Sequence, residues 1–436
     1  MPGRLLNWPA WREYEAVPQE IAFEEEFSKA KAAVIAEYGE EGLTKSWLKV
    51  CKELDTVTNH LANQGSTAIP VYEYSEIASK GFSEEQREQI KAKGCCIVRN
   101  TIPEDTAKSL FQDLKKFVTE NKGAINGWPA ESPAILRLFN SPTQIKIRTD
   151  PRHIALQRQL NALFHDASGE TSPEPLSYTD ATRIRPPGQT FLGLGPHIDA
   201  GSLCRWAHPQ YRKVYDRIFS GEPESHDAYD LDVRKDADQY MFPAGAHSAV
   251  FRAFQGWTAL TSASPSCGTL MLYPNVKTVI AYVMLRPFFS PPKDDNDVMD
   301  AIKWTFDEKS SWFPGTTVTE SQRLSTLSHP HLRLKDCLMH IPPMGPGDTV
   351  WWHTDMCHAV DPEHKGEGDA SVVYIAACPT TNTNKDYVKK QLQAALAGEG
   401  PPDRVGLQLN EPALKGYEGF DNVSEEGKVV LGFNLL

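Results

Sequence analysis

The stretch from residue 182 to residue 199 reads TRIRPPGQTFLGLGPHID, and it decides the fold that we expect. Short runs of alternating apolar and polar residues are interrupted by Pro and Gly, which is typical of β-strands separated by turns. His197 and Asp199 end the stretch. Because residues two apart in an extended chain point to the same side, these two side chains can act together.

The same pattern continues through the next 180 residues or so. Strand-like runs occur at VFRAFQGWTALTSA (250–263), GTLMLYP (268–274), TVIAYVMLRPFF (278–289), DTVWWHTD (348–355) and SVVYIAACP (371–379). Many short strands with such punctuation indicate a sandwich or a jelly roll. We therefore expect a mainly β core accompanied by helices.

Three regions follow from the pattern along the chain. Residues 1–177 are expected to be a helical region packed on the core, with a capping box from Ser83 to Gln86. Residues 178–379 are expected to form the core, and residues 380–436 a C-terminal helix and tail. The core is interrupted by insertions at 205–245 and 290–343. Each insertion could form a lid or a subunit contact, and a subunit contact would allow a homodimer.

Composition narrows the function. The chain has 436 residues, 40% of them hydrophobic, and a net charge of −12. An acidic chain without a dense Lys/Arg stretch argues against a nucleic-acid partner. No run approaches the roughly 18 apolar residues of a membrane span, and no secretory signal is evident, so we expect a cytoplasmic protein. The eight cysteines contain no CxxC pair, and we expect reduced, mostly buried thiols.

The tripeptide His197-Ile198-Asp199 suggests a metal site. Non-haem iron enzymes that use O2 commonly bind the ion with two His and one carboxylate on one face, which leaves positions open for other ligands. The stretch GPGDTVWWHTDMCHAV (345–360) offers two candidates for the second His, His353 and His358. They differ by five residues, so a regular strand directs them to opposite faces. His329, His331, His340 and His364 lie in polar or Pro-rich segments, and we expect them at the surface.

Residues from Gly193 to Ser371 resemble the phytanoyl-CoA-hydroxylase-like branch of the Fe(II)/2-oxoglutarate-dependent dioxygenases. That branch has H-x-D, an apolar strand, G-x-L-x-x-x-P, and later G-D with a His about ten residues on. The matching residues here are His197 and Asp199, 251–260, 268–274, and Gly347-Asp348 with His358. SPTQIKIR (141–148), PHIDAGSLCRW (196–206) and FRAFQGWTAL (251–260) are also similar to a large microbial family of mostly unassigned function. The resemblance covers about the last two thirds of the chain.

The resemblance implies a double-stranded β-helix (jelly roll, cupin-like) and an oxygenase that uses Fe(II), 2-oxoglutarate and O2. It selects His358 over His353 as the third iron ligand, beside His197 and Asp199. Such an enzyme oxidises a C–H bond of a small molecule, here one with amino-acid-like character. Hydroxylation, desaturation and oxidative cyclisation all stay open. Related halogenases replace the carboxylate ligand by a small residue, so the presence of Asp199 disfavours halogenation.

One family feature is missing. Relatives anchor the far carboxylate of 2-oxoglutarate with an Arg on the strand after the distal His, whereas this chain reads EGDASVVYIAACP (367–379). Ser371 is present there, but the Arg is not. Because an unpaired buried carboxylate is costly, we expect another base, and we favour Arg252 slightly over Arg286. Arg183, Arg185 and Arg205 are weaker candidates.

Two other classes of function stay open at this point. One is a metal-dependent jelly-roll enzyme that does not use 2-oxoglutarate, such as a thiol dioxygenase or an isomerase. The other is a scaffold or sensor without catalysis, for which the two insertions would be partner surfaces. Oxygen uptake and succinate release separate all three.

Overall fold

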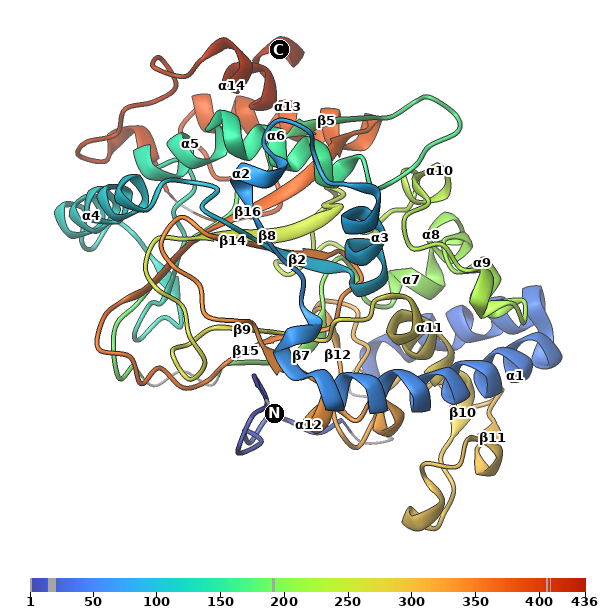
Figure 1. Cartoon of the computed structure of the whole chain (residues 1–436). Coiled ribbons are helices and arrows are strands. Elements are labelled where there is room, and N and C mark those ends of the chain that lie inside the picture. Colours follow the sequence, from blue (N-terminus) through green and yellow to red (C-terminus); the bar gives the residue numbers. More distant parts are fainter. Residues whose placement is uncertain (1, 15–20, 190–192, 405–406, 408) are drawn as a thin grey trace.

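The computed structural model describes the chain except for residues 1, 15–20, 190–192, 405–406 and 408. It combines helices with two main β-sheets (Figure 1). The long N-terminal segment α1 (Glu24–Gln64) is interrupted at Gly39, whose φ of 75° lies outside the helical region. Its buried stripe, which includes Val34, Trp47 and Leu54, packs on α11 (Lys277–Leu285).

The larger sheet has nine strands in the order β1-β2-β14-β8-β16-β6-β4-β3, with β5 also paired to β16. All pairs are antiparallel except β1 with β2. The strands are β1 (Val71–Glu73), β2 (Cys95–Arg99), β3 (Gly127–Trp128), β4 (Ile135–Leu136), β5 (Ser172–Leu176), β6 (Thr182–Arg185), β8 (Phe254–Ala259), β14 (Thr349–His353) and β16 (Ala370–Thr380).

The smaller sheet has five antiparallel strands in the order β12-β7-β15-β9-β13. They are β7 (Leu194–Ile198), β9 (Leu270–Leu272), β12 (Gln322–Arg323), β13 (Met339–His340) and β15 (His358–Val360). Figure 1 shows the larger sheet above the smaller one. A shared hydrophobic cluster joins Trp257 and Trp352 of the larger sheet to Leu272 of the smaller sheet. Among the described residues the sheets share no strand, so they form no closed barrel.

Strand alternation gives the larger sheet two different faces. Trp257, Trp352 and Val372 point toward the smaller sheet, while Trp351 and Val373 belong to a second cluster on the opposite face. Helices from the first part of the chain cover that outer face (Figure 1). They include α2 (Tyr74–Ile77), α3 (Glu84–Lys93), α4 (Glu104–Glu120), α5 (Pro142–Arg148) and α6 (Pro151–Asn161). The expected capping box from Ser83 to Gln86 is present at the start of α3.

The insertions are built from short elements. The first contains α7 (Cys204–Ala207), α8 (Pro209–Lys213), α9 (Asp216–Phe219) and α10 (Leu231–Arg234). The second contains β10 (Phe289–Ser290) paired with β11 (Thr305–Phe306), then β12, α12 (Leu334–Cys337) and β13. The C-terminal part contains the expected helix, α13 (Asn382–Leu396), and α14 (Glu425–Val430).

Two expectations about secondary structure need correction. The run 278–289 was expected to be a strand, but it forms most of α11, whose residues 278–285 are all buried. A uniformly apolar run has no polar face, so its period cannot distinguish a buried strand from a buried helix. The first 177 residues are also not only helical, because they contribute β1 to β5 to the larger sheet.

The placement of four histidines was wrong. His329, His331, His340 and His364 are all buried, not at the surface. His331 packs against Trp47 of α1, with ring centroids 5.5 Å apart, and its Nδ1 lies 3.0 Å from the Tyr282 hydroxyl. The cysteines are as expected, with none in a disulfide and seven of the eight buried.

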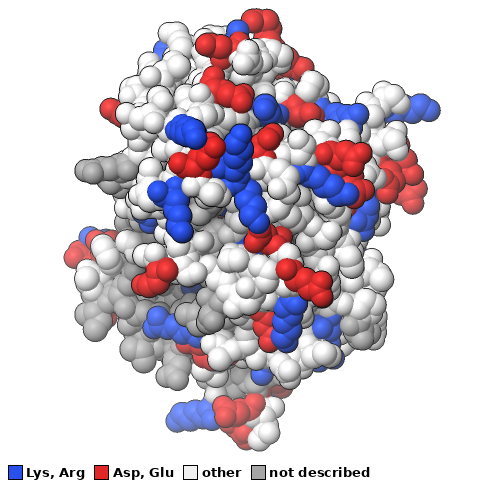
Figure 2. Space-filling model, turned by 90° about the vertical axis from the view of Figure 1, so that its left-hand side faces the viewer, with Lys and Arg blue, Asp and Glu red and all other residues white. Residues whose placement is uncertain are grey.

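Charged side chains of both signs lie on one face of the molecule. On the face drawn in Figure 2, basic and acidic side chains are intermixed over most of the surface. No helix in the described ranges has both the length and the apolar character that crossing a bilayer requires.

Candidate metal centre

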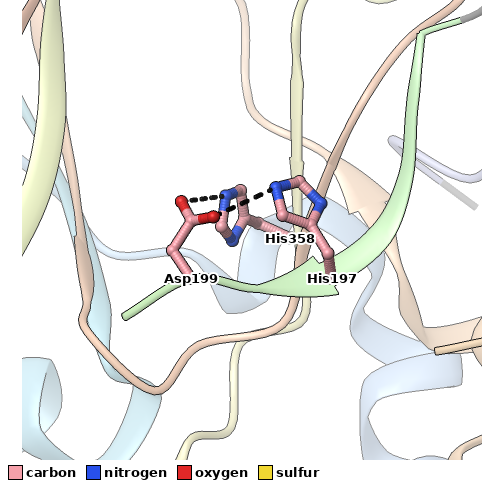
Figure 3. Close-up of side chains that lie close together, drawn as sticks. All are labelled: His197, Asp199 and His358. Carbon is pink, nitrogen blue, oxygen red and sulfur yellow. Dashed lines mark ion pairs between the residues drawn. The ribbon is translucent and has the colours of Figure 1, made fainter. Parts of the chain in front are cut away.

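Two neighbouring strands of the smaller sheet bring His197, Asp199 and His358 together (Figure 3). His197 on β7 is the direct register partner of His358 on β15, and their ring centroids are 4.1 Å apart. Asp199 follows the last residue of β7, so its side chain points to the same side as that of His197. Their three ligand atoms lie within 4.8 Å of one another.

The spacing between the three groups suits an ion between them. Asp199 Oδ1 is 3.7 Å from His197 Nε2, and Asp199 Oδ2 is 3.5 Å from His358 Nε2. Both distances are too long for direct hydrogen bonds. Two ligand atoms that are each about 2.1 Å from one metal lie roughly 3.0–3.4 Å apart. The donor set and its spacing therefore fit a small divalent cation.

Backbone carbonyls fix the orientation of both imidazoles. His197 Nδ1 lies 2.8 Å from the carbonyl oxygen of Gly195, and His358 Nδ1 lies 3.0 Å from that of Met356. A carbonyl can only accept, so each Nδ1 carries the hydrogen, and each Nε2 keeps a free lone pair toward Asp199. Metal-binding histidines in proteins have this outer hydrogen bond as a rule.

The charge states at neutral pH also suit metal binding. Burial, together with the neighbouring His358, lowers the pKa of His197 to about 3, so this imidazole is neutral. Burial alone would raise the pKa of Asp199. However, His358, His197 and Arg252 outweigh burial and hold this pKa well below its usual range. The site therefore presents a carboxylate and a neutral imidazole, the ligand forms that a metal requires.

Residues from the two insertions hold Asp199. The Ser321 hydroxyl donates a 2.9 Å hydrogen bond to Asp199 Oδ1. Arg205 donates to the backbone carbonyl of Asp199 at 2.6 Å. The Tyr211 hydroxyl donates to the carbonyl of Ala200 at 2.7 Å. The sequence contains no signal for Ser321, which is 122 positions away in an irregular segment. Arg205 had been considered only as a weak carboxylate anchor.

His353 does not join this group. Its Nε2 lies 3.0 Å from the carbonyl of Ala228, and its Nδ1 accepts a hydrogen bond from the backbone N–H of Asp355. The ring also stacks on Phe164 at 5.4 Å between centroids. Both nitrogens are thus occupied by backbone groups, so His353 has no free lone pair for a metal.

A cavity of about 300 Å³ opens beside the three side chains. Trp257, Trp352 and Tyr374 of the larger sheet line one side of it. Asp199 contributes the more exposed ligand side chain, 23% against 5% for each imidazole, so the open side of the group lies at the carboxylate. A small molecule in the cavity could therefore approach a metal held there.

The proposed anchors for 2-oxoglutarate lie in different places. Arg252 lines the cavity, with its guanidinium 5.3 Å from the ring centroid of Tyr178. Arg286 lies elsewhere, between Trp304 and Trp312 at 4.4 and 4.6 Å, and it donates to the carbonyls of Ser328 and Phe289. We therefore withdraw Arg286 as a candidate, since its donors are used in the core.

Ser371 is near the cavity wall but does not line the cavity. Its hydroxyl donates a 2.8 Å hydrogen bond to the backbone carbonyl of Arg183. The side chain of Arg183 lines the cavity, and this residue is only 6% exposed. Of the five arginines considered from the sequence, Arg252 and Arg183 thus reach the cavity.

Comparisons with known proteins give the family. The Gig2-like family model matches residues 21–433. The uncharacterized protein YbiU of Escherichia coli (strain K12) is 32% identical over 391 residues, which cover 86% of this chain and 88% of that protein. The crystal structure of GlcNAc Inducible Gene 2 from Candida albicans has a TM-score of 0.83 at 27% identity, with 97% of this chain and 90% of that chain covered. A Salmonella typhimurium structure, described as a proposed oxidoreductase, has a TM-score of 0.78 at 27% identity, with 96% and 99% covered. The chain belongs to the Gig2-like family.

Proposed function

We propose that this protein is a non-haem Fe(II) oxygenase that uses 2-oxoglutarate and O2 to oxidise a C–H bond of a small molecule. The observation that carries the proposal is the convergence of His197, Asp199 and His358 beside a cavity. Two imidazoles and one carboxylate on one face are the ligand set of non-haem Fe(II) oxygenases. The description of the Salmonella typhimurium relative as a proposed oxidoreductase agrees with this class.

The strand arrangement supports a double-stranded β-helix of the jelly-roll type. Two antiparallel sheets share one hydrophobic cluster, and the candidate ligands come from the adjacent strands β7 and β15. The resemblance to the phytanoyl-CoA-hydroxylase-like branch places its ligands on such a pair. We extend both the fold name and the branch to this chain as part of the proposal.

Arg183 is the residue that we propose for the far carboxylate of 2-oxoglutarate. It lies on β6 directly opposite Val372 of β16, which is the strand where relatives carry their anchoring Arg. Its side chain lines the cavity, and together with Arg185, Leu194 and Val360 it also lines a small neighbouring recess of about 10 Å³. Arg183 thus supplies from the neighbouring strand the guanidinium that β16 lacks. This assignment replaces our expectation from the sequence, which favoured Arg252.

The length of the co-substrate supports this assignment. Leu194 precedes His197 by three residues on β7, so their Cα atoms lie about 10 Å apart along the strand. A five-carbon keto acid that binds a metal at one end, with bonds of about 2.1 Å, and a guanidinium at the other, at about 2.9 Å, also spans on the order of 10 Å.

When bound, Fe(II) would supply the activation of O2, with 2-oxoglutarate as the source of two electrons. The chain's own residues orient and isolate the reactants. Gly195 and Met356 hold the imidazoles through their carbonyls, and Ser321 holds the carboxylate. Trp257 and Trp352 form a wall of the cavity and restrict the access of water from that side.

Anaerobic titration tests the proposal. Addition of 2-oxoglutarate to the Fe(II)-loaded protein should produce a metal-to-ligand charge-transfer absorption band. Arg183→Gln should weaken 2-oxoglutarate binding by about 100-fold or more, because a buried charge pair loses one partner. Iron binding should persist. The matched control is Arg217→Gln, which changes an exposed arginine paired with Glu222 and should leave the affinity unchanged.

The outcome also separates the other two classes. With O2 admitted, the account predicts oxygen uptake and release of succinate. Absence of the absorption band, with iron bound, would contradict the use of 2-oxoglutarate and favour a metal enzyme of another type. Absence of both iron binding and oxygen uptake would favour a scaffold or sensor.

A further inference from the structure

Arg252 lies at a second polar position in the cavity, distinct from the recess of Arg183. It precedes β8, and Asn384 fixes the adjacent backbone by hydrogen bonds of 2.8 and 2.9 Å to the N–H and carbonyl of Phe251. Asn384 is fully buried. The guanidinium lies over Tyr178 and lines the cavity beside Ser248 and Asp199. Arg252 is thus held in place by the fold.

The guanidinium of Arg252 lacks an anionic partner of its own. Its Nε is buried without a hydrogen-bond partner, and among the described residues it forms no ion pair. Two other arginines of the cavity differ, since Arg323 pairs with Glu320 at 3.4 Å and Arg404 with Asp180 at 3.7 Å. Because Arg252 is only partly exposed and its Nε is buried, an anion that a ligand brings to it gains a strong charge-assisted interaction.

The net charge of the cavity changes little when the proposed metal and 2-oxoglutarate bind. Arg183 and Arg252 contribute two unpaired positive charges, and Asp199 contributes one negative charge. A divalent metal together with doubly negative 2-oxoglutarate adds no net charge. One positive charge is then uncompensated, and Arg252 carries it, since Arg183 faces the recess assigned to 2-oxoglutarate.

We infer that Arg252 binds a carboxylate of the primary substrate, an inference that rests on the proposed function. The substrate is then a small carboxylic acid, whose apolar part would lie against the aromatic wall of Trp257, Trp352 and Tyr374. A planar guanidinium binds a carboxylate through two parallel hydrogen bonds, which fixes the orientation of the acid as well as its position. Arg252 would therefore set which carbon of the acid faces the metal.

The test uses matched pairs of acids and amides. The twenty L-amino acids, phenylacetate and phenylpropionate are added to the whole protein loaded with Mn(II), first without and then with 2-oxoglutarate. The rise in melting temperature and the change in tryptophan fluorescence are measured. We expect at least one acid to bind, and we expect its primary amide to bind about 30-fold more weakly or not at all.

Variants locate the binding group. Arg252→Gln should weaken the binding of that acid by about 30-fold or more, and Arg252→Lys should restore part of it, because Lys keeps the charge but not the fork. Arg252→Gln should leave 2-oxoglutarate affinity within about threefold, whereas Arg183→Gln should show the reverse pattern. Circular dichroism of each variant establishes that it is folded.

The outcomes separate the two proposals. If 2-oxoglutarate does not bind but an acid binds through Arg252, the proposed function fails and the substrate inference holds. If 2-oxoglutarate affinity falls in Arg252→Gln and acid binding does not, the substrate inference is wrong. It is also wrong if no acid of the panel binds, or if the amides bind as well as the acids.

Discussion

The chain contains two H-x-D tripeptides, His197-Ile198-Asp199 and His353-Thr354-Asp355, and their side chains have different binding partners in the structure. In the first, the imidazole of His197 binds the carbonyl of Gly195 through Nδ1 and leaves Nε2 free beside a cavity. In the second, both ring nitrogens of His353 bind backbone groups, and Asp355 pairs with Arg205 and Arg234 in the interior. The tripeptide alone therefore does not define a metal site, and the partners of its atoms do.

Arg205 connects the two tripeptides. Its Nη1 donates to the Asp355 carboxylate at 2.6 Å, and its Nη2 donates to the backbone carbonyl of Asp199 at 2.6 Å. Arg234 neutralises the second oxygen of Asp355. The second tripeptide thus supports the backbone of the first, and the predictions below aim to separate a supporting role from a ligand role.

The largest expected effect concerns stability. Asp355→Asn leaves Arg205 and Arg234 buried without a full negative partner, so we expect the free energy of unfolding to fall by about 3–5 kcal/mol. Asp199→Asn in the metal-free protein removes a carboxylate that lies at the edge of a cavity and is not paired with two buried arginines, so it should cost less than Asp355→Asn. Urea unfolding of both variants measures the difference. Equal losses would mean that Asp355 has no special structural role.

A smaller effect is expected for the hydroxyl that holds Asp199. Ser321→Ala removes the hydrogen bond to Asp199 Oδ1 and should weaken metal affinity by about 10–100-fold. Ser325→Ala provides a comparison, since this serine in the same insertion bonds to Ser328 and not to Asp199. Titration with Mn(II), followed by electron paramagnetic resonance, gives both affinities. No difference between the variants would exclude Ser321 from the support of the site.

The smallest effect concerns pH. Burial lowers the pKa of His353 to about 3, against about 6.5 in the unfolded chain. The unfolded state then binds more protons below pH 6.5, so this histidine destabilises the fold as pH falls from 6.5 toward 3. At pH 5.5 the contribution is about 1.4 kcal/mol. The free energy of unfolding between pH 7.5 and 5.5 should thus fall less in His353→Gln than in the parent. Parallel pH profiles would contradict the assignment of a buried neutral imidazole.

The two-residue period of side chains along a β-strand allowed part of the site to be predicted from the sequence. Parity placed His197 and Asp199 on one side. The parity argument for His353 and His358 assumed one continuous strand and was wrong, because His353 ends β14 of the larger sheet and His358 begins β15 of the smaller sheet. The period of the apolar residues could not distinguish a helix from a strand at α11. Residues 278–285 are all buried, so neither pattern has a polar face.

Other features depend on tertiary contacts that no local pattern encodes. The loop histidines are buried because other segments cover them, as α1 covers His331 through Trp47. Ser321 reaches Asp199 because β12 pairs with β7, which joins residues far apart in the chain. Arg183 could be recognised as a cavity residue only once β6 was found beside β16. Such pairings are set by the packing of the whole domain.

Anomalous diffraction at the iron absorption edge, from crystals loaded with Fe(II) without oxygen, tests the central claim most directly. The account predicts one strong peak about 2.0–2.2 Å from His197 Nε2, from an oxygen of Asp199 and from His358 Nε2. No peak at these three residues, or a peak at His353 and Asp355 instead, would contradict it.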